Sequence, residues 1–307
     1  MKKVVITGAN GFVGRNTAEI FLSHGYTVFA MDLSGRTVLP QNNNLNYIQC
    51  DISEIEKSKD KIGSADVFIH FAWTGSAGNG RTDHELQIKN ALTTVNCLKF
   101  AKSIGCEKFI CAGSIMEYES EYAVHAAGVK PNKAYIYGVG KALAHSLSKI
   151  IAADLGIDLV WPMITNAYGE GENSPRMLNT TLRKIIDGED LNFTAATQNY
   201  DFIHVKDVAA AFYLISVYGK PFTEYVIGSG NAKPLKYFIK EMVDAVAPDY
   251  PLNFGSVPFT GVNMPLDVFC TDNLKNDCGF TPTVSFTEGV KRTFEYLKTP
   301  KNYDTKI

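Results

Sequence analysis

The sequence predicts an α/β protein with a doubly wound parallel sheet and a smaller, discontinuous α+β lobe. Apolar, β-branched runs recur through the first half of its 307 residues, helix-like stretches separate them, and this alternation ends near residue 165. Continuous apolar strands that alternate with helices form parallel sheets covered on both faces. Right-handed crossovers between such strands give the doubly wound arrangement.

The first half of the chain supplies the strands and helices of the predicted sheet domain. The predicted strands are VVI at 4–6, VFAM at 28–31, VFIHF at 67–71, KFICA at 108–112 and LVW at 159–161. The predicted helices span residues 14–24, 85–104 and 136–155.

Beyond residue 165 the pattern changes. The segment NAYGEGENSPRM, at 166–177, is rich in glycine, asparagine and proline and predicts a loop. A helix over about 177–188, the strand DFIHV and the helix DVAAAFYLISVYG follow; further helices are predicted near 235–247 and from 286. We assign residues 1–165 and about 200–224 to the sheet domain, and about 166–199 and 225–307 to the second lobe.

Composition restricts the partners. Charged residues make up 20% of the chain, the formal net charge is −2, and lysine and arginine form no run. This predicts neither a nucleic-acid nor a membrane partner. The N-terminal apolar run is too short for a signal peptide. The six cysteines form no C-x-x-C pair and no ligand-like spacing with histidine, so we expect reduced thiols, no metal site and a cytoplasmic location.

The stretch TGANGFVG, at 7–14, follows the first predicted strand and opens a helix. Gly8 permits a tight turn, Gly11 lets backbone amides approach a pyrophosphate, and Gly14 allows close packing of helix on sheet. The sheet domain is therefore predicted to bind a dinucleotide. We assign the turn residues Gly8, Asn10, Gly11, Phe12 and Val13 to the cofactor.

Acidic residues after the next strands bear on cofactor choice. Asp32 ends the second strand, where a carboxylate binds ribose hydroxyls and repels a 2′-phosphate, so NAD is favoured. Arg36, four residues after Asp32, keeps NADP possible as the cofactor. Asp51, followed by Ile52, is assigned to the adenine end of the cofactor, although a turn or cap role is equally compatible.

The stretch AYIYGVGK, at 134–141, offers two tyrosines and one lysine. Tyr137 and Lys141 share one face of a helix because they are four residues apart. Tyr135 lies about 240° away around the helix, at or before its start, and is predicted to pack or to form a pocket wall. A phenol is a weak base at neutral pH, and a neighbouring ammonium stabilises its phenolate.

These motifs together resemble the extended short-chain dehydrogenase/reductases, and within them the nucleotide-sugar epimerase/dehydratase/reductase group. The glycine turn, Ser114 after a strand, and Tyr137 with Lys141 carry the resemblance. Further matches are HFAW at 70–73, Asn90 with LTTVNCLKFA after it, TNAYGEG at 165–171, DFIHVKDVA at 201–209, IGSG at 227–230 and CGFTPTVSFTEGV near the end.

The resemblance implies a Rossmann domain, an NAD cofactor, a nucleotide-diphosphate sugar as substrate, and a homodimer that pairs through helices 85–104 and 136–155. It assigns Ser114, Tyr137 and Lys141 to catalysis, and Tyr137 and Lys141 also to the cofactor. Phe71, Ala72 and Asn90 are implied to contact the cofactor as well. The implied substrate-binding residues are Trp73, Met116, Asn166 and Arg176.

Residues after Ser114 discriminate among the family's reactions. Sugar 4,6-dehydratases usually carry an Asp-Glu pair directly after the catalytic serine or threonine, whereas this chain has Ile115 and Met116, which transfer no proton. Fucose-synthase-type enzymes usually have a cysteine at the position of Met116. Glu117 comes one place later, and on a strand or extended turn its side chain would point the other way. It is assigned a surface or hydrogen-bonding role.

The remaining set of serine, tyrosine and lysine suffices for two reactions. The loop WTGSAGNGRTDHE, at 73–85, resembles reductases that make deoxy sugars, which favours a 4-keto-6-deoxy-sugar reductase. The alternative is a nucleotide-sugar 4-epimerase with tightly bound NAD. A more remote alternative is a non-catalytic, dinucleotide-sensing Rossmann protein.

The sequence assigns the substrate-binding residues less specifically than the cofactor-binding residues. Asn166 is alternatively a turn residue, and Arg176 and Arg183 are candidates for a diphosphate or are solvated helix charges. Relatives commonly have an arginine where this chain has Tyr200. Asp207 is predicted to cap the following helix, and His70 and His204 to be satisfied core or loop histidines. His84 is the histidine expected in the pocket loop.

Overall fold

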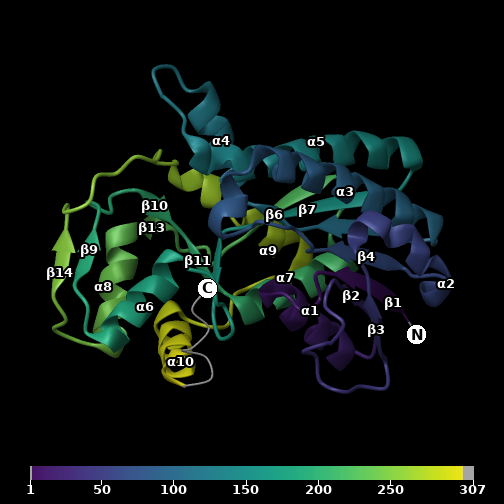
Figure 1. The fold of residues 1–307 in the computed structure, drawn as a ribbon, viewed down its shortest axis with the longest axis horizontal. Coiled ribbons are helices and arrows are strands. Elements are labelled where there is room, and N and C mark those ends of the chain that lie inside the picture. The colour runs from purple at the N-terminus through teal and green to yellow at the C-terminus, as the bar shows by residue number, and fades with distance from the viewer. Residues whose placement is uncertain (1, 300–307) are drawn as a thin grey trace.

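The computed structural model describes residues 2–299, and its centre is a parallel sheet (Figure 1). The strand order is β12-β7-β5-β4-β1-β2-β3, and the short strand β6 pairs with β7. The bounds are β1 Lys3–Thr7, β2 Thr27–Asp32, β3 Leu45–Gln49, β4 Val67–His70, β5 Lys108–Cys111, β6 Gly113–Ser114, β7 Asp158–Ile164 and β12 Thr223–Ile227. The order reverses between β1 and β4, the switch point where ligands of open α/β sheets bind. The predicted fold class is confirmed.

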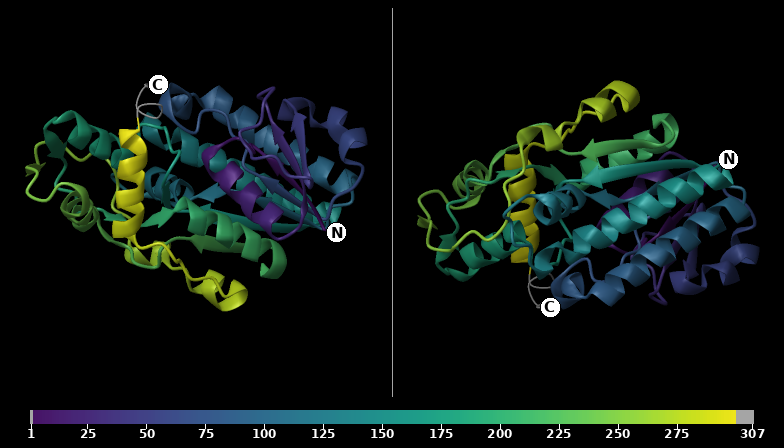
Figure 2. Two further views of the ribbon diagram at one scale, coloured as in Figure 1. Left: turned by 90° about the horizontal axis from the view of Figure 1, so that it is seen from below. Right: turned by 90° about the horizontal axis from the view of Figure 1, so that it is seen from above.

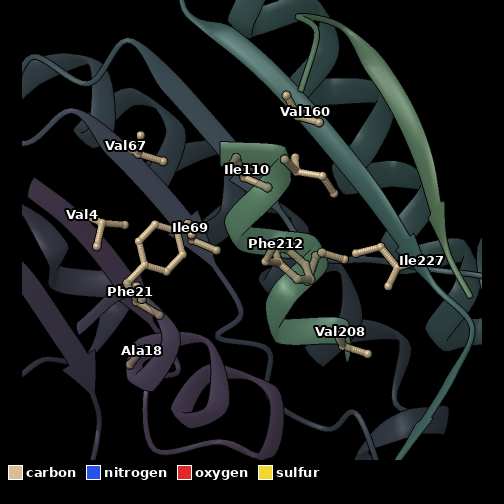
Figure 3. Packing of buried hydrophobic residues seen from close by; sticks show 14 of the residues in the cluster. Val4, Ala18, Phe21, Val67, Ile69, Ile110, Val160, Val208, Phe212 and Ile227 are labelled. Carbon is tan, nitrogen blue, oxygen red and sulfur yellow. The ribbon is translucent and has the colours of Figure 1, made fainter. Parts of the chain in front are cut away.

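Alternate side chains of the strands face opposite helical layers. Val4 and Ile6 of β1 belong to a core with Phe21 and Phe212, whereas Val5 belongs to a second core on the other face. Figure 3 shows Phe21 and Phe212 pointing toward sheet residues of the first core.

Six helices in the described part of the chain cover these two faces. The first core lies under α1 Phe12–Ser23, α7 Val205–Tyr218 and α9 Asp272–Cys278. The second lies under α2 Lys59–Ile62, α3 His84–Ser103 and α5 Ile136–Leu155. In Figure 2 (right), α3 and α5 run side by side across the sheet.

Local chemistry sets the starts and ends of α3 and α5. Asp83 accepts a hydrogen bond from the backbone N–H of Leu86, and so caps α3. Asn132 likewise accepts from Ala134 N at the start of a 3₁₀ turn, Lys133–Tyr135, that leads into α5. Gly156 ends α5 in the left-handed conformation, with φ of 61°. The predicted ranges of both helices are confirmed to within a residue.

The second lobe has its own apolar core. Phe202, Phe238 and Val290 are buried in it. Its elements are α6 Met177–Asp187, β9 Leu191–Phe193, β10 Asn199–Tyr200, β13 Lys233–Pro234, α8 Leu235–Val246, β14 Leu252–Phe254 and α10 Phe286–Lys298. Strand β14 pairs in parallel with β9, and β13 pairs antiparallel with β10.

Two parts of the chain depart from the predicted boundaries. The predicted loop at 166–177 begins with a strand, β8 Asn166–Tyr168, which pairs with β11 Phe202–His204. The predicted second lobe, 225–307, includes segments that belong to the sheet domain: β12 pairs with β7, and α9 buries Leu274 in the core under α7. These are long-range pairings that local patterns do not reveal.

A helix also follows Ser114 directly. Residues Met116–His125 form α4, where an extended turn was expected. Gly138 of α5 lets the two helices approach, because a Cβ there would lie 2.1 Å from the carbonyl oxygen of Met116. Glu117 is therefore on the first turn of a helix, and the reasoning from strand alternation does not apply to it.

Candidate active site

The loop between β1 and α1 turns tightly. Gly8 has a φ of 67°, a conformation that other residues rarely adopt. A Cβ on Gly14 would lie 2.1 Å from the carbonyl oxygen of Gly8, so glycine is needed for α1 to start this close to β1. Gly11 precedes the first residue of α1, and no side chain caps the helix there. The first backbone N–H groups of α1 can therefore face an anion.

A cavity of about 620 Å³ lies beside this turn. Its walls include residues that follow strands of the sheet, at the switch point, and residues of α3 and α5. The predicted cofactor residues that line it are Gly8, Gly11, Phe12, Val13, Asp32, Asp51, Ile52, Phe71, Ala72, Asn90, Tyr137 and Lys141. The cavity thus gathers segments that are far apart in sequence.

Asn10 is the predicted cofactor residue that is not among the lining residues. Its amide Nδ2 donates to the carbonyl oxygen of Arg36, at 2.9 Å, and its Oδ1 accepts from the N–H of Val38. Its backbone N–H donates to Asp32 Oδ2, at 3.0 Å. Asn10 therefore fixes the loop after β2 and orients the Asp32 carboxylate. The Arg36 side chain is exposed.

Asp51 lies at the cavity and also has the turn role considered for it. It lines the cavity, and its carboxylate accepts hydrogen bonds from the backbone N–H and the hydroxyl of Ser53. Those hydrogen bonds lower the pKa of Asp51.

The predicted catalytic residues come from two elements. Ser114 ends β6, and Tyr137 and Lys141 lie on α5. Tyr137 and Lys141 are buried, and the Lys141 ammonium donates to the carbonyl oxygen of Ala112, at 2.8 Å. Tyr135 is buried in the 3₁₀ turn before α5 and does not line the cavity beside the glycine turn.

The loop after β4 covers this pair with two cation–π contacts. The Lys141 ammonium lies 3.8 Å from the centre of a Trp73 ring, and the Arg81 guanidinium lies 4.1 Å from the centre of the Tyr137 ring. Buried Gln87 holds the loop: it accepts from Trp73 Nε1 and donates to the carbonyl oxygens of Gly75 and Gly80.

A second cavity, of about 340 Å³, meets the first. The two cavities share Ser114, Tyr137 and Arg176 among their lining residues. Met116 and Asn166 also line the second cavity, whereas Trp73 lines the first. A molecule in the second cavity would therefore meet a molecule in the first cavity at the predicted catalytic side chains.

Three charged residues of the second cavity were missed in the sequence. Arg81, Glu119 and Glu172 line it. Burial lowers the pKa of Arg81 and raises the pKa of Glu119, and the charge of each partly offsets this effect on the other. The sequence signal for Arg81 was its position in the polar loop at 73–85, which resembles the loop of deoxy-sugar reductases. Glu119 gave none, because its helix was not predicted.

The remaining residues considered in the sequence lie partly at the second cavity and partly away from it. Tyr200 lines the second cavity, but Arg183, half-buried on α6, is not among its lining residues. His84 is exposed at the first residue of α3 and is not a lining residue of either cavity. His70 and His204 are satisfied, as predicted: His70 bonds to Thr7 and Thr94, and His204 to Glu170.

The predicted capping role of Asp207 is wrong. His204 caps α7, by accepting from the N–H of Lys206. Asp207 instead accepts hydrogen bonds from the backbone N–H groups of Thr283 and Val284 and from the Thr283 hydroxyl. It therefore ties α7 to the segment before α10, a partner 76 residues away that local sequence does not indicate.

In residues 2–299, no group of three or more His, Cys, Asp or Glu residues is arranged to hold a metal ion. No helix in the same range is long and apolar enough to cross a membrane. None of the six cysteines is paired in a disulfide, and five of them are buried.

A glycine turn at the switch point of a parallel sheet, beside serine, tyrosine and lysine, defines an extended short-chain dehydrogenase/reductase. The chain belongs to the NAD dependent epimerase/dehydratase family, whose model matches residues 4–228. It is 22% identical over 299 residues to the CDP-abequose synthase of Salmonella muenchen, covering 95% of this chain and 96% of the relative.

Two further relatives differ in the reaction that they are named for. The dTDP-4-dehydro-6-deoxyglucose reductase of Escherichia coli is 22% identical, over 96% of this chain and 97% of the relative. The structure of Bacillus cereus UDP-glucuronic acid 4-epimerase, a complex with NAD and a UDP-sugar, is similar with a TM-score of 0.79 at 20% identity. That similarity covers 96% of this chain and 98% of the epimerase chain.

Proposed function

We propose that this protein is an NAD-dependent enzyme that transfers hydride at C4 of a nucleotide-linked sugar, acting as a 4-keto-6-deoxy-sugar reductase. One observation carries the proposal: the cavity at the glycine turn and the neighbouring cavity meet at Ser114 and Tyr137. A carbonyl carbon at that junction could face a nicotinamide while its oxygen contacts both hydroxyl groups.

Each residue at the junction has a chemical task. When bound, the reduced nicotinamide supplies a hydride to the carbonyl carbon. Ser114 donates a hydrogen bond to the oxygen on which negative charge develops, and Tyr137 donates the proton that completes the alcohol. The Arg81 guanidinium on the face of Tyr137 stabilises the phenolate left behind. The Lys141 ammonium adds positive charge on the same helix and holds the nicotinamide ribose.

The surroundings of Ser114 argue against 4,6-dehydration by the family's usual residues. Ile115 is buried with Met264 and Phe269, and Met116 presents a thioether to the second cavity. Neither side chain can move a proton. Glu119, a carboxyl group on this cavity wall, is proposed to bind a sugar hydroxyl.

The charges of the second cavity suit a nucleotide-diphosphate sugar. Arg81 and Arg176 line it together, and burial together with the charge of Arg176 lowers the pKa of Arg81. Two neighbouring guanidinium groups favour a doubly charged anion, such as a diphosphate. Tyr200 lies in the same cavity, so these arginines can provide the contact that relatives make with an arginine at its position. The names of the CDP- and dTDP-sugar relatives support this substrate class.

The 4-epimerase reaction is the second candidate. It needs the same three residues, and the likeness to the UDP-glucuronic acid 4-epimerase structure supports it. In that case NAD would stay bound and return the hydride to the opposite face of the ketone.

The absorbance of reduced nicotinamide tests the proposal. Purified protein is mixed with nucleotide-linked 4-keto-6-deoxy sugars, and NADH and NADPH are supplied separately. The proposal expects stoichiometric loss of NADH absorbance with one sugar. No loss with any sugar, together with NAD that is released only on denaturation, would overturn the reductase and favour the epimerase.

We also propose that the protein forms a homodimer through α3 and α5. These helices lie side by side, and their outer faces expose large apolar residues. The exposed residues are Ile88, Leu92, Val139, Leu143, Leu147 and Ile150. Contiguous exposed apolar surface of this kind marks an interaction site.

A further inference from the structure

Behind Ser114 lies a buried carboxylate that the reaction described above does not use. Glu117 is 3% exposed, on the first turn of α4. Its Oε1 accepts a hydrogen bond from the backbone N–H of Ser114, at 2.9 Å, and another from the indole N–H of Trp161, at 3.1 Å. A buried carboxylate is kept only where such partners compensate for its lost hydration.

The other oxygen of Glu117 faces α5. His145 Nδ1 lies 3.3 Å from Glu117 Oε2, and the imidazole stacks on the indole of Trp161, with 4.5 Å between ring centres and an interplanar angle of 2°. His145 follows Lys141 by four residues, as Lys141 follows Tyr137, so the three share one face of α5. The helix that bears the tyrosine therefore reaches the carboxylate that holds the serine.

The contacts continue away from the cavities. His145 Nε2 lies 3.7 Å from Glu224, whose carboxylate also accepts from the Tyr118 hydroxyl, at 2.9 Å. Gly113 fits closely against Trp161, since a Cβ there would lie 2.5 Å from the indole nitrogen. Neither Glu117 nor His145 is a lining residue of the cofactor or the substrate cavity.

We propose that Glu117 and His145 are positioning residues that hold Ser114 in register with Tyr137 and Lys141. The inference rests on the proposed function, because it assumes that Ser114 and Tyr137 meet the same sugar oxygen. β6 has two residues, so its own ladder contributes little to fixing Ser114. The Glu117 carboxylate supplies that restraint, and His145 ties it to α5.

A double-mutant cycle with Ser114→Ala tests this proposal. Glu117→Ala should lower kcat by up to about 100-fold, the effect of a small misplacement of reacting groups, while the Kd for NAD stays unchanged. In the Ser114→Ala background, the same change should have almost no further effect, because the hydroxyl that Glu117 positions is already absent. A general structural role would lower kcat equally in both backgrounds, and that result would overturn the proposal.

Two more variants test the contacts of Glu117 one at a time, and a third is a control. Glu117→Gln keeps an oxygen acceptor for both N–H groups and should retain most activity. His145→Phe keeps the stack on Trp161 but loses the contact with Glu117, so kcat should fall with the Kd for NAD unchanged; an unchanged kcat would remove His145 from the proposal. Glu121→Ala, an exposed change on the same helix, is the matched control and should have no effect.

Hydrogen exchange makes the test independent of turnover. Exchange of the Ser114 amide should accelerate in Glu117→Ala but not in Glu117→Gln or Glu121→Ala. Unchanged exchange in Glu117→Ala would overturn the positioning role. If exchange accelerates while the unmodified protein turns over no nucleotide sugar, the proposed function fails and the restraint on Ser114 stands.

Discussion

At the scale of single residues, the surroundings of Tyr137 are central. Its ring lies under the Arg81 guanidinium and meets Trp73 edge-on, with 6.2 Å between ring centres. Trp73 in turn carries the Lys141 ammonium on its face. The tyrosine and lysine are therefore held by aromatic and cationic neighbours from one loop.

Replacement of Tyr137 tests its role as the proton donor. Tyr137→Phe should reduce turnover by at least about 100-fold, the lower range for general acid catalysis, and leave NAD binding nearly unchanged. Tyr135→Phe is the matched control, because Tyr135 lies two residues away and lines neither cavity. Steady-state kinetics and NAD titration measure both effects. Full activity in Tyr137→Phe would refute the assignment.

A second residue-scale prediction concerns His70. Burial, with a smaller contribution from Lys141, lowers its pKa to about 3. The unfolded chain, where histidine titrates near 6.5, binds the proton first as the pH falls. The stability that neutral His70 allows is therefore complete above about pH 6.5 and is lost as the pH falls toward 3.

Urea unfolding at pH 7, 6 and 5 measures this effect. Below pH 6.5 the free energy of unfolding should fall by up to about 1.4 kcal/mol per pH unit from this group. His70→Asn should flatten that dependence, whereas the exposed control His84→Asn should not. Equal pH slopes in His70→Asn and the unmodified protein would contradict the prediction.

Whether the role of a residue could be predicted depends on how far away along the sequence its contacts lie. Tyr137 and Lys141 share a helix face, so their spacing alone relates them. Arg81 reaches Tyr137 only because Gln87 of α3 holds the loop. Asp207 contacts Thr283, 76 residues away, and no local pattern relates the two.

At the scale of elements, the turn between β1 and α1 lines the cavity that is proposed to hold the cofactor. Within a helix, Gly14→Ala would usually increase stability through helix propensity. Here the added methyl group would lie 2.1 Å from the Gly8 carbonyl oxygen, so the helix start has to move.

Gly14→Ala should therefore weaken NAD binding by at least about tenfold and cost about 1–3 kcal/mol of stability. Calorimetric titration and urea unfolding measure the two effects. Gly35→Ala, where the nearest atom to the new Cβ is 3.5 Å away, is the control and should change neither. NAD affinity that is unaffected by Gly14→Ala would show that the turn does not shape the cofactor site.

Element boundaries were predictable where apolar periodicity and caps agree. α3 and α5 match their predicted ranges, and a side chain caps the start of α3 and the turn leading into α5. α4 was missed since its ten residues include three glutamates, and packing on α5 rather than pattern stabilises it. The predicted boundary at about residue 224 falls inside β12, because the partner of this strand, β7, is distant in sequence.

At the scale of the whole molecule, the uncovered apolar face of α3 and α5 predicts pairing of two chains. The double variant Leu92→Lys with Ile150→Lys places charges where these side chains are 60% and 69% exposed. It should sediment as a monomer while the unmodified protein sediments as a dimer. Tyr218→Lys, on exposed surface of α7, is the control. A monomeric unmodified protein at micromolar concentration would rule out the proposed dimer.

The central claim for the whole molecule is hydride transfer at sugar C4, across the junction of the two cavities. NADH that carries deuterium at the transferring position is incubated with a nucleotide-linked 4-keto-6-deoxy sugar, and the product is examined by NMR. Hydride transfer at C4 should place one deuterium at C4, in a single stereochemical position, and none at other ring carbons. A reduced product with hydrogen at C4, or with deuterium at another carbon, would contradict it.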